Sequence, residues 1–149
     1  MPDWTFQAQS SGAAQAVEQV PGAFRRVLAD GDRMMVIEWT MNAGVVVPLH
    51  NHPHEQSGYV ISGEMVFTCD GKENRIMPGM GYAVAGNVPH GARFPVPTVI
   101  IDIFSPPRED YRGDKPSTYT LTPKKPAKKA APKKKAAAKP KPSVKSKKR

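Results

Sequence analysis

The stretch that decides the fold is Gly44–Gln56, which reads GVVVPLHNHPHEQ. Two histidines, His50 and His52, are separated by one residue and follow a run of apolar residues. In a strand, residues two apart point to the same face and lie about 7 Å apart along the chain. The two imidazoles can therefore converge on one ion if the strand curves into a barrel. Gln56 follows as a third donor, after Pro53 lets the chain bend.

On both sides of this stretch, short β-like runs alternate with turn residues. Asp70-Gly71 lies between two such runs and is the strongest hairpin signal, because a type I′ turn needs positive φ at both central residues. Short strands at this spacing, without a helical period, predict an all-β antiparallel sandwich or barrel. The strands we expect are Phe24–Ala29, Met34–Met41, Val45–His52, Gln56–Ile61, Glu64–Cys69, Lys72–Met77, Tyr82–Ala85, Val88–Phe94 and Thr98–Phe104.

The alternation also predicts how two of these strands face. One face of the first histidine-bearing strand should carry Val46, Pro48, His50 and His52. Both of its faces begin with apolar residues, so we expect cover on both sides, from another sheet or from a second subunit. In the last strand, Asp102 shares a face with apolar neighbours, where a carboxylate is costly unless it is paired or bound to something.

A fourth candidate donor, His90, follows another glycine-containing turn. Three imidazoles with a neutral amide oxygen suit a divalent metal such as Zn, Ni, Fe, Mn or Co. A single histidine on a strand is more often a hydrogen-bonded polar residue than a ligand, so the spacing alone leaves both interpretations open. Glu55 is an alternative to Gln56 as a ligand, although it is one residue closer to His52. We expect His54 to be exposed or to face the substrate.

These residues resemble a known motif. The spacing Gly44-x5-His50-x-His52-x3-Gln56-x6-Gly63 is similar to the first motif of the cupin superfamily, with Gln56 where most members have Glu. Residues 79–94 resemble the second motif in weaker form, with His90 in register; the departures are at Ala85, Asn87 and Phe94. The resemblance implies a single-domain cupin, a double-sheet jelly-roll barrel with a metal held inside.

Further segments narrow the resemblance to the pectin-degradation cupins of the KdgF type. They are His52–Val60, Asn87–Ala92 and Ile101–Tyr111, of which the last is the most distinctive. The similarity covers about residues 20–115. In that family the glutamine is itself characteristic. Its members convert 4,5-unsaturated monouronates, released from pectin or alginate, into linear 5-keto-4-deoxyuronates.

The resemblance implies roles for two sets of residues. The metal ligands would be His50, His52, Gln56 and His90, and the catalytic or substrate-binding set would be Asp102, Phe104 and Arg108. A neutral glutamine leaves the ion more positive than a glutamate would, so the site attracts anionic oxygens more strongly. Burial would raise the pKa of Asp102 and suit it to proton transfer. The planar fork of Arg108 matches a carboxylate, and Phe104 would wall the pocket.

Each role has a structural alternative. Asp102 could pair with Arg108 or Arg93 as a bridge, Arg108 could be a solvated loop charge, and Phe104 could be an ordinary core residue. The function has alternatives too. A three-histidine site also suits an iron-dependent dioxygenase, and the barrel could be a non-catalytic sugar-acid-binding module that a basic tail tethers to nucleic acid.

Charge divides the chain into two parts. Residues 1–122 carry 9 Lys+Arg against 13 Asp+Glu, a net charge of −4, whereas residues 123–149 carry 13 basic residues and no acid. The folded part is therefore no basic nucleic-acid-binding domain. The Lys/Ala/Pro-rich segment should be disordered, and such a segment binds polyanions, nucleic acid among them, without sequence preference. We expect a loose N-terminal arm or short strand over residues 1–20 that docks through Trp4 and Phe6, a barrel over 21–115, and a linker and tail over 116–149.

The remaining sequence features concern compartment and assembly. No apolar run approaches the ~20 residues that a membrane helix needs, so we expect no membrane insertion. The first residues lack the pattern of a secretory signal, and the single cysteine, Cys69, cannot form an internal disulfide. We therefore expect a cytoplasmic protein. The apolar strand Val45–Leu49 favours a homodimer.

Overall fold

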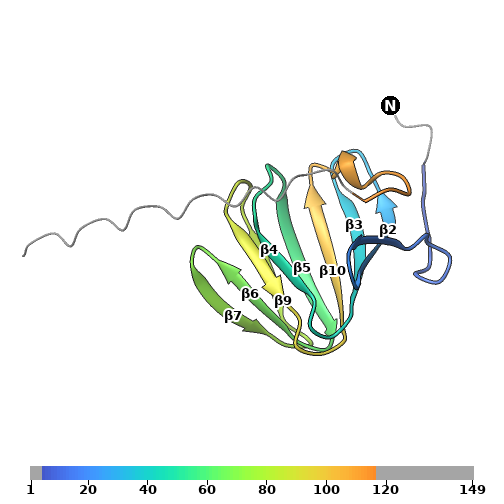
Figure 1. Cartoon of the computed structure of the whole chain (residues 1–149). Helices are drawn as coiled ribbons and strands as arrows, with labels where there is room; N and C mark the ends of the chain where they lie inside the picture. Colours follow the sequence, from blue (N-terminus) through green and yellow to red (C-terminus); the bar gives the residue numbers. More distant parts are fainter. Residues whose placement is uncertain (1–4, 117–149) are drawn as a thin grey trace, which may run out of the picture.

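A computed structural model describes residues 5–116. Its strands form two antiparallel sheets that face each other around a common interior (Figure 1). One sheet has the strand order β1-β2-β3-β10-β5-β8 and the other β4-β9-β6-β7. The strands are β1 (Val17–Val20), β2 (Ala23–Asp30), β3 (Met35–Met41), β4 (Val46–His50), β5 (Glu55–Ser62), β6 (Met65–Cys69), β7 (Lys72–Ile76), β8 (Gly81–Val84), β9 (His90–Arg93) and β10 (Thr98–Ser105).

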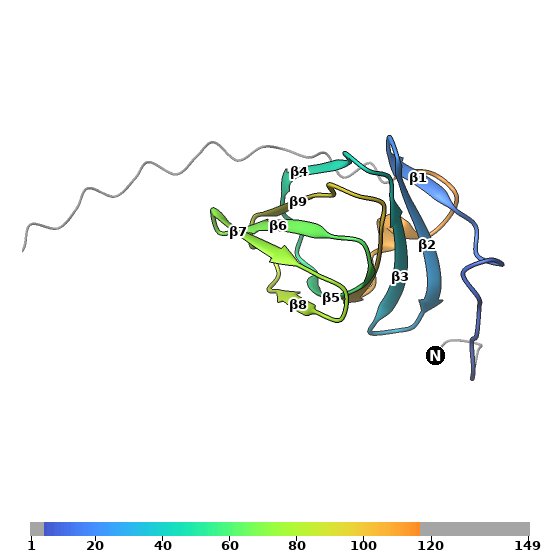
Figure 2. The same ribbon diagram turned by 90° about the horizontal axis from the view of Figure 1, so that it is seen from below.

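The chain crosses repeatedly from one sheet to the other. It passes from β3 to β4, back to β5, across to β6 and β7, and then through β8 and β9 to β10. Figure 2 shows the strands of both sheets curving around one interior. In the described part of the chain, the helical structure is the single 3-10 turn η1 (Glu109–Tyr111). The predicted all-β, double-sheet jelly-roll barrel is confirmed.

The core follows from alternation along the central strands. On β3, every second residue is buried, beginning with Met35 and continuing through Ile37 and Trp39 to Met41. The inward residues of the opposite sheet, among them Met65 and Phe67, pack against the same cluster. Because the large apolar residues occupy only part of the interior, polar side chains of β5, β9 and β10 also lie within the barrel.

The predicted hairpin is present, and the N-terminal arm includes a short strand, but its predicted docking through Phe6 is wrong. Asp70 and Gly71 have φ of 49° and 73° and join β6 to β7. Within the expected arm, β1 pairs with β2 and so belongs to the sheet. Phe6 is 82% exposed and does not dock. Trp4 and the basic segment 117–149 lie outside the described residues. Among residues 5–116, no helix has the length and apolar character needed to cross a membrane.

The facing predicted for the first histidine strand is wrong at Val46. That side chain is 62% exposed, whereas Val47 and His50 both border the interior. The pairing of β4 with β9 is irregular between Val47 and His50, and an irregularity of this kind shifts the alternation. Gly91 permits it, since a Cβ there would lie only 2.9 Å from the carbonyl oxygen of Val47. Within the described chain, the outer side of β4 remains uncovered.

Candidate metal centre

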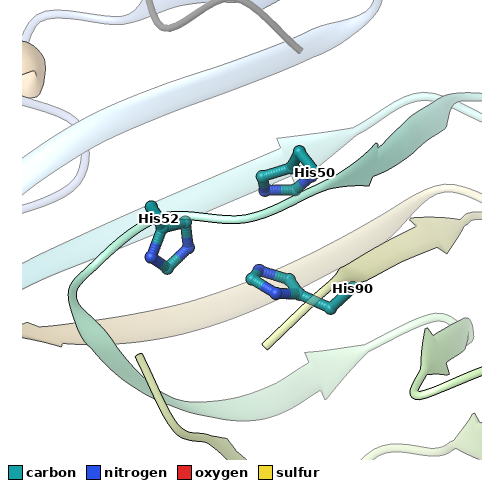
Figure 3. A group of neighbouring side chains, drawn as sticks. All are labelled: His50, His52 and His90. Atoms are coloured by element: carbon teal, nitrogen blue, oxygen red, sulfur yellow. The ribbon is translucent and has the colours of Figure 1, made fainter. Parts of the chain in front are cut away.

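Three histidines from separate positions in the chain meet inside the barrel (Figure 3). His50 ends β4, His90 begins β9 opposite it, and His52 lies in the loop that follows β4. One candidate ligand nitrogen from each ring lies within 4.8 Å of the others. The ring centroid of His90 is 4.5 Å from that of His50 and 4.8 Å from that of His52. The barrel thus brings the distant His90 to the pair.

A backbone carbonyl orients each of these rings. Nδ1 of His50 lies 2.8 Å from the carbonyl oxygen of Pro48. Nδ1 of His52 lies 3.1 Å from that of His54, and Nδ1 of His90 lies 2.7 Å from that of Val88. Since a carbonyl oxygen only accepts, Nδ1 carries the hydrogen in each neutral ring and Nε2 keeps the lone pair. Nε2 of His90 is buried with no hydrogen-bond partner. This tautomer, fixed by an outer hydrogen bond, is the one that metal-binding histidines use.

Burial keeps these imidazoles neutral. Desolvation lowers the pKa of His50, lowers that of His52 to about 3, and lowers that of His90 to about 4. The positive charge of Arg108 adds to the effect on each of them. Because a metal ion binds the neutral ring, protons do not compete for these nitrogens near neutral pH.

Gln56, on β5, supplies the fourth polar group. Its Oε1 atom lies 3.2 Å from Nε2 of His52. With the hydrogen of His52 on Nδ1, both atoms are acceptors and cannot satisfy each other. A cation between them removes this conflict, and so the residues present fit a divalent metal. Glu55, the alternative ligand, is exposed on the opposite face of β5.

The predicted exposure of His54 is wrong. It is only 9% exposed, and its Nδ1 atom has no hydrogen-bond partner. It borders a surface groove with Pro53, Pro106 and Pro107. The loop turns at Pro53, so His54 does not continue the strand alternation into the barrel.

Asp102 is 4% exposed and accepts a 2.5 Å hydrogen bond from the Tyr82 hydroxyl. Burial raises the pKa of Asp102 to about 6, although hydrogen bonds from Tyr82 and Gln56 oppose the rise. Among residues 5–116, Arg93 pairs with Glu73 and Arg108 pairs with Asp110, and neither arginine forms an ion pair with Asp102, although the charge of Arg108 lowers the pKa of that carboxyl. Asp102 therefore has a neutral partner in place of the predicted arginine.

Arg108 is a buried residue and not a solvated loop charge. It is 3% exposed, and its Nε and Nη2 atoms donate to the two carboxylate oxygens of Asp110 at 2.9 and 2.7 Å. Its guanidinium carbon lies 4.1 Å from the ring centroid of Tyr111 and 5.4 Å from that of Phe104. Phe104 itself is 2% exposed and meets His52 edge to face at 5.6 Å.

All seven predicted residues border one cavity of about 350 Å³. The three histidines and Gln56 lie along one part of its wall, while Asp102, Phe104 and Arg108 come from β10 and the segment after it. The volume is near the lower end of the ~300–1,000 Å³ that small-molecule sites occupy. The remaining wall is mainly apolar and aromatic, so a bound molecule would lose most of its water.

Sequence reasoning missed Tyr82 and Trp39. Both border the cavity. Nε1 of Trp39 makes no hydrogen bond at ordinary distance, yet it lies close enough to Asp102 to lower the pKa of that carboxyl. One available signal was Gly58, since a glycine inside a strand often marks the close approach of another group.

The comparisons with known proteins agree with this geometry. A cupin domain model matches residues 37–104. An RmlC-like cupin from Shewanella frigidimarina superposes with a TM-score of 0.68 at 28% identity, covering 72% of this chain and 96% of that one. Ectoine synthase from P. lautus gives a TM-score of 0.55 at 25% identity, covering 60% of this chain and 67% of that one. No curated protein sequence matches the chain.

A barrel with histidines gathered inside it is the arrangement of the cupin superfamily, and this chain carries a cupin domain over residues 37–104. Within that superfamily it resembles KdgF. The structure of KdgF from Halomonas sp. superposes with a TM-score of 0.68 at 29% identity, covering 71% of this chain and 98% of that one.

Proposed function

We propose that this cupin is a metal-dependent enzyme that opens 4,5-unsaturated monouronates to linear 5-keto-4-deoxyuronates. One observation carries the proposal: a neutral three-histidine cluster with Gln56 shares a small cavity with a buried carboxyl, Asp102. The similarity to KdgF selects the substrate class from among the reactions that such a cavity could serve. The cavity volume also suits a single sugar acid better than a chain of them.

His50, His52, Gln56 and His90 would hold the divalent metal, through Nε2 of each imidazole and Oε1 of the amide. When bound, the ion supplies positive charge that favours an ionised oxygen of the substrate. All four ligands are neutral, so the site keeps the full charge of the ion. Two of the three histidines are almost fully buried, which excludes water that would weaken this attraction.

Asp102 would carry the proton. In the ring form, its carboxylate removes the proton from the anomeric hydroxyl while the bond between C1 and the ring oxygen breaks. This leaves an aldehyde at C1 and an enolate at C5. The same proton then passes from Asp102 to C4, giving the 5-keto product, so no atom is gained or lost. A pKa of about 6 leaves the group mostly ionised at neutral pH yet able to hold a proton briefly.

Arg108 and Phe104 would position the substrate. The bridge to Asp110 uses two of the five N–H donors of the guanidinium and fixes its plane. We propose that Arg108, which borders the cavity, attracts the substrate carboxylate with its charge. Phe104 would pack on the sugar, at the side of His52.

The test is loss of the ultraviolet absorbance of the C4=C5 unit when purified, metal-loaded protein meets unsaturated galacturonate. We expect loss well above the rate without protein, and a fall of about 10²-fold or more for Asp102→Asn. Glu55→Gln is the matched control, because it removes an exposed carboxylate from the other face of β5. Absorbance that stays at the protein-free rate refutes the proposal. Oxygen uptake with iron bound would favour the dioxygenase alternative.

A further inference from the structure

A glutamine ligand has two different ends. Only the amide oxygen can coordinate a cation, because the NH₂ group has no available lone pair. The two ends are similar in shape, so packing alone selects poorly between them. Something in the cavity must therefore decide which end of Gln56 faces the histidines.

The position of Gln56 shows what decides it. Its Oε1 atom lies 3.2 Å from Nε2 of His52, so the NH₂ group is the end turned away from that histidine. The side chain also lowers the pKa of both Asp102 and Tyr82, as a nearby donor does. Since a carboxylate only accepts, the NH₂ group of Gln56 must point to Asp102. Its Oε1 atom then remains on the side of His52, at 3.2 Å from Nε2.

Strand register places these groups together. Asp102 of β10 and Tyr82 of β8 lie opposite Gly58, on the two sides of β5. The residues Gln56 and Gly58 are two apart, so they share the inner face of β5. With only hydrogen at Gly58, Tyr82 reaches across the strand and bonds Asp102 at 2.5 Å. A Cβ at Gly58 would lie 2.3 Å from the Tyr82 hydroxyl and 2.6 Å from Oδ1 of Asp102.

We propose that Tyr82 and Asp102 are positioning residues that turn the amide oxygen of Gln56 toward the three histidines, so that the metal affinity of the site depends on them. Tyr82 acts twice: its hydroxyl oxygen accepts from Gln56, and its hydrogen holds Asp102 in place. This inference rests on the metal site of the proposed function. It is independent of the substrate.

The experiment measures the dissociation constant for Zn²⁺ by competition with a chromophoric chelator. Tyr82→Phe changes no charge and keeps the ring, whose centroid lies 5.1 Å from that of Phe67. We expect it to weaken Zn²⁺ binding about tenfold, in the range typical of outer hydrogen-bond partners of metal ligands. Tyr59→Phe is the control, because it removes an exposed hydroxyl from the other face of β5 and should leave the affinity unchanged.

Tyr82→Phe in a Gln56→Glu background separates two causes of weaker Zn²⁺ binding: loss of the orientation of the Gln56 amide, and a nonspecific loosening of the cavity. A carboxylate has two equivalent oxygens and needs no orienting partner, so the effect of Tyr82→Phe should disappear there. Asp102→Asn also removes a charge; it should cost more affinity with Gln56 present than with Gln56→Glu. Equal losses in both backgrounds, or no loss with Gln56, overturn the inference. A wild-type protein that binds no Zn²⁺ refutes the proposed metal site itself.

Discussion

Gly58→Ala tests the contact between Tyr82 and Asp102, which meet over Gly58 on the inner face of the six-stranded sheet. The added Cβ would lie 2.2 Å from Cζ of Tyr82, whereas ordinary contacts begin near 3.4 Å. The ring must therefore retreat by about 1 Å, which takes its hydroxyl away from Asp102. Strand pairing on both sides of Gly58 prevents the backbone from moving away instead.

The expected cost has two parts. Overpacking a buried position typically costs about 1–3 kcal/mol. Losing a hydrogen bond to a charged group adds about 1.5–3 kcal/mol, and here the bond lost is the 2.5 Å contact with the Tyr82 hydroxyl. We therefore expect the free energy of unfolding to fall by about 3 kcal/mol or more. Denaturant unfolding of the metal-free protein measures it.

Two further variants make this prediction specific. Gly12→Ala is the matched control, since a Cβ at Gly12 would have no neighbour within 4 Å, and its stability should change little. In a Tyr82→Ala background the clash with the ring disappears and the 2.6 Å contact with Oδ1 of Asp102 remains, so Gly58→Ala should cost at least about 1 kcal/mol less than it does in the wild type. Equal costs in the two backgrounds, or a Gly58→Ala protein as stable as the Gly12→Ala protein, would contradict the reasoning.

Three other predictions use stability and binding. Metal at about 100 times its dissociation constant should raise the free energy of unfolding by about 2.7 kcal/mol. A chelator should reverse this stabilisation, and His90→Ala should largely abolish it. The pKa of Asp102 is about 6 in the folded protein against 3.8 ordinarily, so ionisation of this group should cost the metal-free wild type up to about 3 kcal/mol between pH 4 and pH 7 relative to Asp102→Asn. The comparison with that variant is needed because the lowered histidine pKa values add stability to both proteins over the same pH range. Asp102→Asn should lack that loss in denaturant titrations at both pH values. Deleting residues 123–149 removes a charge of +13, so salt-dependent retention on DNA should vanish while uronate turnover stays unchanged.

Local sequence signals predicted the parts of the fold that depend on neighbours in the chain. Asp70-Gly71 specified a hairpin because its turn chemistry is confined to two residues. The His50/His52 spacing indicated a shared site by the same kind of rule. Val46 was placed on the wrong face because the irregularity that reorients it depends on a different strand, through Gly91. Alternation read from one strand cannot contain that information.

The partners of the candidate site were harder to predict for the same reason. Asp102 required a partner, and arginine was the obvious choice by charge. The actual partner, Tyr82, is selected by cross-strand register with Gly58, which no single strand reveals. The ion pair of Arg108 was likewise not predicted. Arg108 bonds Asp110, two residues further along, because the chain folds into η1 at that point.

Different contacts position the two halves of the cavity, so a substitution can impair substrate binding without impairing metal binding. The metal half depends on the register of β4, β5 and β9 within the sheets. The half that carries Arg108 lies in the segment after β10, which is tied to β2 by Arg25 through the carbonyl oxygens of Tyr111 at 3.0 Å and Lys115 at 2.6 Å. The Tyr111 ring also contacts both guanidinium groups, with centroid distances of 5.0 Å to Arg25 and 4.1 Å to Arg108. Loosening at Arg25 should therefore displace Arg108 while the histidines stay in place, so substrate affinity would suffer before metal affinity does.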